Sequence, residues 1–339
     1  MVVKRVWGQY ENTDVFLFTI INKNGHKITL TNYGASVVEV WVPDRKGRVA
    51  NVVLGFPTLE GYLTDKCFIG NTIGRFANRI ANGSFIIDGR RYLLELNENN
   101  HSNHSGESGF NRRLFNFKLQ KSAVVFSLES KDGDGGFPGN LNVSITYSWN
   151  DRDELVIVYN AVSDRKTILN LTNHCYFNLS GGRQDILKHM LKIEADKIVE
   201  VDEQYISTGK LVNAGEKEFC RLQPISSKLT AAGGRRQGLN DCYVVKTRNG
   251  QLPVCEAWDQ HSGRVLKVFS SYPGLLVYTG DYLKTVTNGH LGKPYIPFDG
   301  FCLECQFYPD SPNHSNFPSV ILEPDMEYNN FIKYSFGVK

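Results

Sequence analysis

Short runs of alternating apolar and polar residues recur along the whole sequence and limit this chain to a fold built from β-strands. One run is unbroken from residue 141 to residue 150, and its apolar positions are Leu141, Val143, Ile145, Tyr147 and Trp149. Such alternation places successive side chains on opposite faces of a strand, so that one face is buried. We expect further short strands at residues 15–21, 27–32, 36–42, 52–56, 85–95, 155–159, 189–200, 253–258, 264–270, 275–279, 301–308 and 328–336.

Turn-forming residues separate these strands. The pairs Asn24-Gly25, Asp88-Gly89 and Asn249-Gly250 favour the left-handed backbone that a tight hairpin turn requires. We expect one short helix, around residues 59–66, and no low-complexity linker divides the chain. The sequence therefore predicts an all-β protein, a large antiparallel β-sandwich that forms a single domain over residues 1–339.

Composition and charge exclude several classes of protein. The net charge is +3 and no block of lysine or arginine is present, so there is no electrostatic basis for binding nucleic acid or a membrane surface. The first residues lack the apolar segment of a secretory signal, and no stretch approaches the length of a membrane span. The seven cysteines are irregularly spaced and imply no disulfide framework. These features favour a cytoplasmic protein.

A carboxylate lies in the middle of a predicted strand, in the segment from Gly300 to Pro318. Before Pro309 the alternation predicts a half-buried strand, whose polar face carries Cys302, Glu304 and Gln306. An unpaired buried carboxylate is costly, so Glu304 has a partner, contacts water or serves chemistry. A lone glutamate in a strand is more often structural. Cys302 and Cys305 fall on opposite faces, which indicates packing thiols rather than a redox pair.

A second alternating segment, residues 170–181, lies far upstream. Its alternation places Thr172, His174, Tyr176 and Asn178 on one face of a strand. A histidine among hydrogen-bonding side chains can be held in one tautomer. His174 alone is more often structural, but Glu304 and His174 together are typical of a base and an acid that face one substrate.

Two further polar segments are candidates for binding. Residues 74–80, GRFANRI, contain Arg75 and Arg79, whose planar forks of donors suit the vicinal oxygens of a polar ligand. The alternative is a pair of surface arginines in salt bridges. Residues 97–110 form a polar loop with His101 and His104. Two histidines alone do not make a metal site, and no Cys/His cluster supplies further ligands, so we expect no metal.

The third polar segment is residues 238–243, in which Asn240 and Asp241 precede a predicted strand. These two side chains are either ligand contacts or the residues of a structural Asx turn.

Taken together, these segments resemble the aldose 1-epimerase (galactose mutarotase) family over nearly the whole chain. The matching blocks are Asn32-Tyr-Gly-Ala35, Leu54-Gly-Phe56, Gly61-Tyr62, Gly74-Arg-Phe-Ala-Asn-Arg-Ile80, Thr172-Asn-His-Cys-Tyr-Phe-Asn-Leu179, Pro273-Gly274 with Tyr278-Thr-Gly280, and Leu303-Glu304 through Pro318. The resemblance implies a galactose mutarotase-like β-supersandwich. It also implies an isomerase that interconverts the α and β anomers of free aldohexoses such as galactose and glucose, without a cofactor.

The resemblance also implies roles for individual residues. Glu304 would be the base that takes the proton of the C1 hydroxyl, and His174, protonated, would be the acid at the ring oxygen O5. Asn78 and Arg79 would contact sugar hydroxyls, and His104 would assist at the ring oxygen. The expected partner is a free monosaccharide.

Three departures from the family pattern bear on sugar preference. The segment Asn103-His104-Ser105-Gly106 replaces a family LHGG-like block. An ungapped match puts Asn240 where the family has a sugar-binding aspartate, and Asp241 follows one residue later. Leu276 stands where the family often has glutamine. Either Asn240 or Asp241 could contact the sugar, and Leu276 either faces the sugar or packs in the core. A lost hydrogen-bond partner changes discrimination strongly.

Other functions stay open at the level of sequence. The chain could be a catalytically weak or silent carbohydrate-binding homologue, or an epimerase for a different aldose or a sugar phosphate, although we find no basic cluster for a phosphate. A glycoside hydrolase would need two carboxylates that flank the bond, for which Asp310 and Asp325 are available in Pro-bounded turns.

Overall fold

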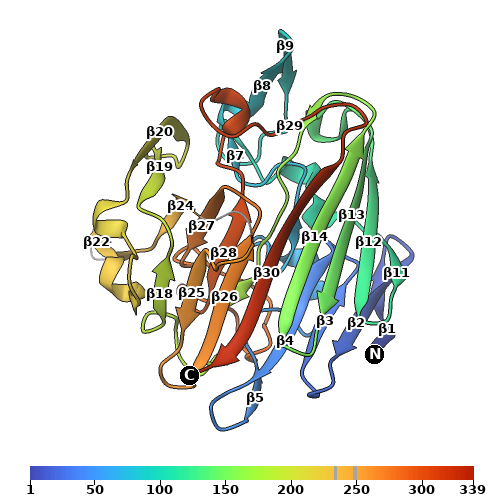
Figure 1. Ribbon diagram of the computed structural model, residues 1–339. Coiled ribbons are helices and arrows are strands. Elements are labelled where there is room, and N and C mark those ends of the chain that lie inside the picture. The colour runs from blue at the N-terminus through green and yellow to red at the C-terminus, as the bar shows by residue number, and fades with distance from the viewer. Residues whose placement is uncertain (233–234, 247–249) are drawn as a thin grey trace.

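The computed structural model describes residues 1–232, 235–246 and 250–339, and antiparallel strands make up most of them. A nine-stranded sheet forms the largest layer, and its long strands cross the front of the molecule in Figure 1. In spatial order its strands are β11 (Asn116–Leu119), β12 (Ala123–Ser130), β13 (Leu141–Trp149), β14 (Glu154–Ser163), β30 (Tyr328–Val338), β26 (Arg264–Ser270), β25 (Cys255–Trp258), β18 (Met190–Ile193) and β21 (Gln223–Pro224).

Two smaller sheets pack behind this layer. The five-stranded sheet contains β1 (Val2–Tyr10), β2 (Thr13–Ile21), β3 (Lys27–Thr31), β4 (Ser36–Pro43) and β5 (Val49–Asn51). The six-stranded sheet has the order β17 (Tyr176–Phe177), β28 (Phe301–Gln306), β27 (Gly274–Tyr278), β24 (Asn240–Val244), β19 (Lys197–Val201) and β20 (Ser207–Asn213). Apolar residues of all three sheets share one core cluster, so the prediction of an all-β antiparallel sandwich is confirmed.

Short two-stranded pieces and single turns of helix complete the described chain. The paired strands are β7 (Arg79–Ile80) with β10 (Ser102–Asn103), β6 (Thr72–Ile73) with β16 (Thr172–Asn173), β8 (Ser84–Ile87) with β9 (Arg90–Leu93), β15 (Thr167–Ile168) with β29 (Ile321–Leu322), and β22 (Thr230–Ala232) with β23 (Arg235–Gln237). The 3₁₀ turns are Ala81–Gly83, Gly106–Ser108, Phe110–Arg112, Asp134–Gly136, Gly215–Lys217, Ile225–Lys228 and Ser311–Asn313. None of the helices among the described residues has the length and apolar character needed to cross a membrane.

The predicted helix is α1 (Leu59–Thr64), which ends two residues earlier than the sequence pattern indicated. The Asp65 carboxylate ends it, because its oxygens accept hydrogen bonds from the backbone N–H groups of Cys67 at 2.8 Å and Ile69 at 2.7 Å. These bonds fold the following segment into a tight turn, which brings Phe68 to the surface of the cavity described below.

Most predicted strands are present, and the alternation at residues 141–149 buries one face of β13 as expected. Residues 85–95 form the hairpin of β8 and β9, with Asp88-Gly89 at its turn. Two predictions were wrong. Residues 52–56 make only an isolated bridge, between Val53 and Phe177, and residues 189–200 divide into β18 and β19, which belong to different sheets. The predicted turn residue Asn249 lies outside the described residues.

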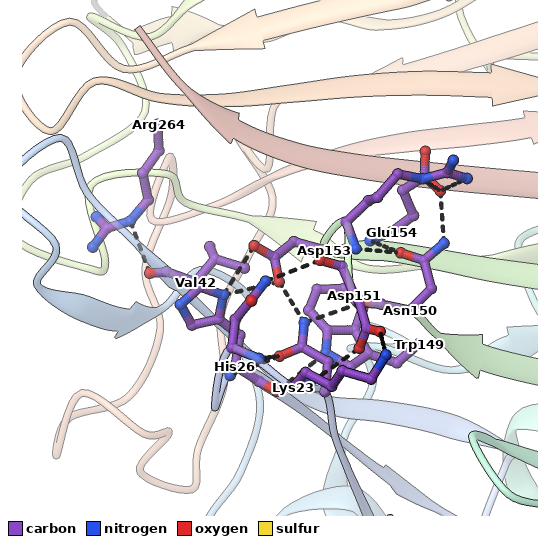
Figure 2. A network of polar contacts seen from close by, with 12 residues as sticks. Lys23, His26, Val42, Trp149, Asn150, Asp151, Asp153, Glu154 and Arg264 are labelled. Atoms are coloured by element: carbon purple, nitrogen blue, oxygen red, sulfur yellow. Dashed lines mark hydrogen bonds and ion pairs between the residues drawn. The ribbon is translucent and has the colours of Figure 1, made fainter.

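Two turns are joined by a cluster of polar contacts, and Figure 2 labels several of its residues, including His26, Asn150 and Asp153. Between β2 and β3, Asn22 donates from Nδ2 to the Asn150 carbonyl at 3.0 Å and to Asp153 Oδ1 at 2.7 Å. Its Oδ1 accepts from the backbone N–H groups of Asn24 and His26, each at 3.0 Å. One amide side chain therefore stabilises its own turn and fastens it to the turn between β13 and β14.

The contacts of Asn22 allow a prediction about stability. Asn22→Ala removes four hydrogen bonds at a half-buried position and should lower the free energy of unfolding by about 1–3 kcal/mol. The matched control is Lys23→Ala, because the ion pair of Lys23 with Asp151 is exposed to solvent and should contribute only about 0–1 kcal/mol. Urea unfolding of both variants measures the difference. Equal midpoints for the two variants would contradict this account of the turn.

Candidate active site

A cavity of about 770 Å³ opens on one side of the six-stranded sheet. Its lining combines residues from β7, β10, β17, β24, β27 and β28 with the turns after α1 and β19. The residues that line it are Asp65, Lys66, Cys67, Phe68, Asn78, Arg79, Asn97, Glu98, Asn99, Asn103, His104, Glu107, Asn111, Arg112, His174, Tyr176, Glu203, Gln204, Tyr205, Asn240, Leu276, Tyr278, Tyr282 and Glu304. It therefore brings together six of the seven residues that the sequence analysis proposed for catalysis or sugar binding, and Asp241 is the seventh.

Glu304 lies at the buried end of the cavity and is 0% exposed. Its strand β28 runs between β17 and β27, and Glu304 is opposite Leu276 on β27. The expectation of a half-buried strand was wrong, because every residue of β28 is buried. Leu303 and Cys305 pack into the main core, whereas the other face of the strand presents Glu304 to the cavity.

His174 is also buried, with 5% of its surface exposed, but it does not lie within a continuous strand as the alternation predicted. It falls between β16 and β17, which belong to different sheets. The backbone there pairs with a third segment, since His174 N–H donates to the Asn71 carbonyl at 2.9 Å and its carbonyl accepts from Gly70 N–H at 3.0 Å. These bonds hold the imidazole against the carboxylate of Glu304.

The imidazole of His174 and the carboxyl group of Glu304 lie close together and have few other polar partners among the described residues. His174 Nε2 lies 3.5 Å from Glu304 Oε1, and neither carboxylate oxygen accepts a hydrogen bond from the described residues. On the other side of the ring, Cys302 Sγ lies 3.5 Å from His174 Nδ1. Both oxygens of Glu304 are therefore available to a ligand, while a thiol contacts the far nitrogen of the histidine.

Burial controls the protonation of this pair. Loss of hydration raises the pKa of Glu304 to about 8, and it lowers the pKa of His174 to about 4. At neutral pH the pair thus carries one titratable proton, which is on the carboxyl group of Glu304, and the imidazole of His174 is neutral. The sequence led us to expect the proton on His174. The pair carries the expected number of titratable protons, one, but the low-polarity surroundings favour the uncharged forms of both Glu304 and His174.

His104 is a second buried imidazole, and its ring centroid lies 5.5 Å from that of His174. Burial, followed by the nearby His174 and Arg79, holds the pKa of His104 well below its usual range. Its Nδ1 accepts a hydrogen bond from Asn78 N–H at 3.1 Å, which leaves the proton of the neutral ring on Nε2. His104 is thus prepared as a neutral hydrogen-bond donor.

The loop that carries His104 shows how its departure from the family pattern is accommodated. His104 and Ser105 have positive φ angles of 53° and 71°, in the left-handed region that favours glycine. The Ser105 hydroxyl accepts from Phe76 N–H at 2.7 Å and donates to the Phe76 carbonyl at 3.2 Å. These two bonds tie the loop to the segment before Asn78, which offsets the cost of the strained backbone.

The two arginines of residues 74–80 have different surroundings. Arg79 lines the cavity, where its Nη2 donates to Glu98 Oε1 at 2.7 Å and its guanidinium lies 5.4 Å from the ring centroid of Tyr205. Its Nε, which is buried, has no partner among the described residues. Arg75 instead donates to the backbone carbonyls of residues 130, 131 and 138, and therefore has a structural role.

Asn240 and Asp241 are separated by the pleat of β24. Asn240 lines the cavity, whereas Asp241 points away from it and accepts from Lys217 Nζ at 2.6 Å. Asp241 was therefore misplaced in our candidate site, because neighbouring residues of a strand face opposite sides.

For Leu276 the sequence left open whether the side chain faces the sugar or packs in the core. It lines the cavity, and it also packs in a small cluster with Val199, Cys242, Tyr308 and Phe317.

The sequence analysis did not assign three aromatic residues of the inner wall, Phe68, Tyr176 and Tyr278, to the site. Phe68 contacts His104 and His174, with ring centroids 4.6 Å and 5.8 Å away, and no sequence pattern pointed to it. Tyr176 lies 5.1 Å from His174 and 6.0 Å from Tyr278, measured between ring centroids. Tyr176 is two residues from His174, so the strand alternation contained a usable signal.

Other candidates lie outside the cavity. His101 accepts from Asn82 N–H through Nδ1 and contacts Gln204 through Nε2, both at 3.1 Å. Asp310 accepts from Ala81 N–H at 3.0 Å and braces the chain that follows Arg79. Asp310 and Asp325 do not line the cavity. The carboxylate pair considered for glycoside hydrolysis is therefore not assembled there.

Comparison with known proteins agrees with this geometry. The family model for aldose 1-epimerase matches residues 17–335. A galactose mutarotase from Bos taurus is 37% identical over 92% of this chain and 91% of its own length. An aldose 1-epimerase from Escherichia coli (strain K12) is 34% identical over 94% of each chain. The crystal structure of an aldose epimerase homologue from C. elegans superposes with a TM-score of 0.89 at 32% identity, covering 95% of this chain and 98% of that one. The chain therefore belongs to the aldose 1-epimerase family.

Proposed function

We propose that this protein interconverts the α and β anomers of a free aldohexose, such as glucose or galactose, by opening and closing the sugar ring. One observation supports this proposal above all others. His174 Nε2 lies 3.5 Å from Glu304 Oε1 at the buried end of a cavity that is large enough to hold a sugar ring. The functions printed for the relatives, galactose mutarotase and aldose 1-epimerase, support the same reaction.

The pair can carry out the reaction as general acid and base. The Glu304 carboxylate takes the proton from the C1 hydroxyl while protonated His174 gives a proton to O5. The electrons of the O–H bond form the C1 carbonyl, and those of the C1–O5 bond go to O5, which becomes a hydroxyl. Rotation about C1–C2 presents the other face of the aldehyde, and ring closure reverses both transfers. Each well-placed proton transfer is typically worth about 10²–10⁴-fold in rate.

This mechanism needs one titratable proton on the pair of Glu304 and His174, which is the number that the pair carries at neutral pH. The proton has to move from Glu304 to His174 when the sugar binds. The C1 hydroxyl favours the carboxylate because it donates a hydrogen bond to it, and a carboxylate that accepts hydrogen bonds has a lower pKa. The ligand thereby replaces part of the hydration that burial removes.

Cys302 has a place in this transfer as a positioning residue. Burial raises the pKa of its thiol well above the usual value, so the sulfur keeps its proton. A thiol is a weak donor and a weak acceptor. It can accept from Nδ1–H of His174 both in the neutral tautomer, whose free Nε2 takes the proton from Glu304, and in the imidazolium, so it contacts both protonation states and keeps Nε2 directed at the cavity.

The remaining cavity residues suit a neutral polyol. Arg79 and Asn78 offer donors and acceptors for ring hydroxyls, and His104 offers its Nε2 proton near the ring oxygen. We assign no sugar contact to Asp241.

We further propose that the chain acts as a single domain, because one sheet joins strands from residue 116 to residue 338. Its seven free cysteines favour a cytoplasmic location, where thiols stay reduced.

The first prediction tests the base. Glu304→Gln keeps the shape of the side chain but cannot accept a proton, so kcat should fall by roughly 10²-fold or more. Polarimetry of freshly dissolved α-D-glucose and α-D-galactose measures the rate. Glu216→Gln, at an exposed position outside the cavity, is the matched control. A Glu304→Gln variant that keeps more than about a tenth of the activity would exclude Glu304 as the base, and sugar binding without acceleration by the unmodified protein would identify a silent homologue.

The second prediction concerns pH. Below about pH 4 the pair gains a second proton, and above about pH 8 it loses its only one. The active form with one proton dominates between these values, so kcat/KM should be bell-shaped, with limbs near pH 4 and pH 8 that belong to the pair as a whole. Initial rates from pH 3 to 10 test this, and a profile that stays flat through pH 8 would contradict the raised pKa of Glu304.

The third prediction tests Cys302. Cys302→Ala removes the contact to Nδ1 and should lower kcat roughly fivefold with little change in KM, which corresponds to one hydrogen bond of about 1 kcal/mol. Cys302→Ser restores a donor and acceptor and should recover most of the rate. Equal rates for the alanine and serine variants would show that the sulfur only fills space.

A further inference from the structure

Three side chains that can bind a metal ion meet at the buried end of the cavity. One donor atom each of His174, Cys302 and Glu304 lies within 4.8 Å of the other two, and all three residues are buried. Cys302 and Glu304 are two residues apart on β28, so their side chains leave the strand on the same face. His174 is 128 positions away from Cys302 in the sequence. The sequence analysis found no Cys/His cluster because the fold, and not the local sequence, assembles this group.

The separations between these donor atoms are close to those of a tetrahedral zinc site. With bonds of about 2.0–2.3 Å to nitrogen, oxygen and sulfur, tetrahedral angles place the ligand atoms about 3.3–3.6 Å apart. Cys302 Sγ lies 3.5 Å from His174 Nδ1, and Glu304 Oε1 lies 3.5 Å from His174 Nε2. A metal ion binds only one nitrogen of the ring. Because the three donor atoms lie within 4.8 Å of one another, side-chain rotations that move them by roughly 1 Å complete the site.

The chemical types of these ligands select zinc over the common hard cations. Thiolate and imidazole groups bind Zn²⁺ well, whereas Mg²⁺ and Ca²⁺ prefer oxygen ligands. One sulfur, one nitrogen and one carboxylate oxygen make three protein ligands, and the cavity lies next to His174 and Glu304. A fourth position therefore stays open toward the cavity, as in catalytic zinc sites, and the ion can enter from that side.

The charge of such a complex suits its buried surroundings. A thiolate and a carboxylate balance the two positive charges of Zn²⁺, and the imidazole binds in its neutral form. Binding displaces the protons of the Cys302 thiol and the Glu304 carboxyl group, and both protons pass to solvent. Both oxygens of Glu304 lack a hydrogen-bond partner among the described residues, so the ion would satisfy a buried acceptor that is otherwise costly. Arg79, which also lines the cavity, is paired with Glu98 at 2.7 Å, and this ion pair reduces its repulsion of a second cation.

We propose that His174, Cys302 and Glu304 form a binding site for Zn²⁺, and that the bound ion inhibits the interconversion of anomers. A metal-bound imidazole cannot take up the additional proton that it would give to O5, and a metal-bound carboxylate is a poor base for the C1 hydroxyl. The ion also occupies the end of the cavity where the reacting atoms of the sugar would lie. The inhibition rests on the proposed function, whereas the binding of zinc does not.

Co²⁺ serves as a spectroscopic probe of this site, because it binds to the same kinds of ligand as Zn²⁺. In a tetrahedral site Co²⁺ absorbs strongly in the visible range, and a bond to a thiolate adds a charge-transfer band in the near ultraviolet. We expect both absorptions to saturate at one Co²⁺ per chain and to disappear when Zn²⁺ is added. Binding of Co²⁺ without the thiolate band would overturn the inference.

Cysteine variants assign the thiolate band to one residue. Cys302→Ser should lose the band and should weaken Zn²⁺ binding, measured by calorimetry, roughly tenfold or more, since even changes beside metal ligands commonly have effects of this size. Cys67→Ser changes another thiol that lines the cavity, and Cys220→Ser changes an exposed thiol outside it. Both of these matched controls should keep the band. A band that persists in Cys302→Ser would overturn the assigned site.

Polarimetry of freshly dissolved glucose, corrected for the rate without protein, tests the inhibition. Zn²⁺ should raise KM and leave kcat unchanged, because the ion and the sugar need the same place. A chelator should restore the rate, and Mg²⁺ should not lower it. Cys302→Ser, which should retain most of the rate, should need roughly ten times more Zn²⁺ or more for the same inhibition. Equal sensitivity of this variant and the unmodified protein would overturn the inhibitory site.

The two kinds of measurement separate this inference from the proposed function. The Co²⁺ spectrum does not depend on catalysis, so a thiolate band that requires Cys302 would support the metal site even if glucose is not interconverted. That outcome would refute only the catalytic function. Fast interconversion of glucose by a protein that shows no such band would overturn the metal site and leave the proposed function intact.

Discussion

The burial of one carboxyl group, which has no hydrogen-bond partner within residues 1–232, 235–246 and 250–339, is the constraint on which the rest of the structure depends. Glu304 is enclosed by protein on every side except the cavity, and its surroundings favour the protonated form. Such an arrangement costs stability and persists only when the surrounding structure enforces it. The enforcement comes from β28, which has strands on both sides and the main core against one face. A strand at the edge of the sheet could shift, and water would then reach the carboxyl group.

Different parts of the fold form the core and line the cavity. Of the three large sheets, the nine-stranded sheet contributes the largest share of the main core and, in the described residues, no side chain to the cavity. The cavity is built instead from β7, β10, strands of the six-stranded sheet and several loops. Loops tolerate change more readily than the sheets that hold them. The strained backbone at Ser105 illustrates this, because a single hydroxyl stabilises a conformation that glycine adopts freely.

The sequence predicted the fold class well, because strand alternation is a direct record of which face is buried. It also identified Glu304, since a carboxylate among apolar positions is conspicuous. It failed where local pattern and tertiary structure disagree. The alternation at residues 170–181 predicted one strand, yet the chain changes sheet at His174. The position of Phe68 depends on a turn set by Asp65, and no periodic signal marks such a turn. The choice between Asn240 and Asp241 required knowing which face of β24 meets the cavity.

The contact between Cys302 and His174 joins residues that are 128 positions apart in the sequence. Neither side chain is placed by its own segment, because His174 depends on the chain at residues 70–71 and Cys302 on the two neighbours of β28. Contacts of such long range form late in folding, since the entropy of closing large loops must be overcome first. A refolding chain would therefore regain its secondary structure before its reactive pair, and the return of activity would mark the closing of the sandwich rather than the appearance of its strands.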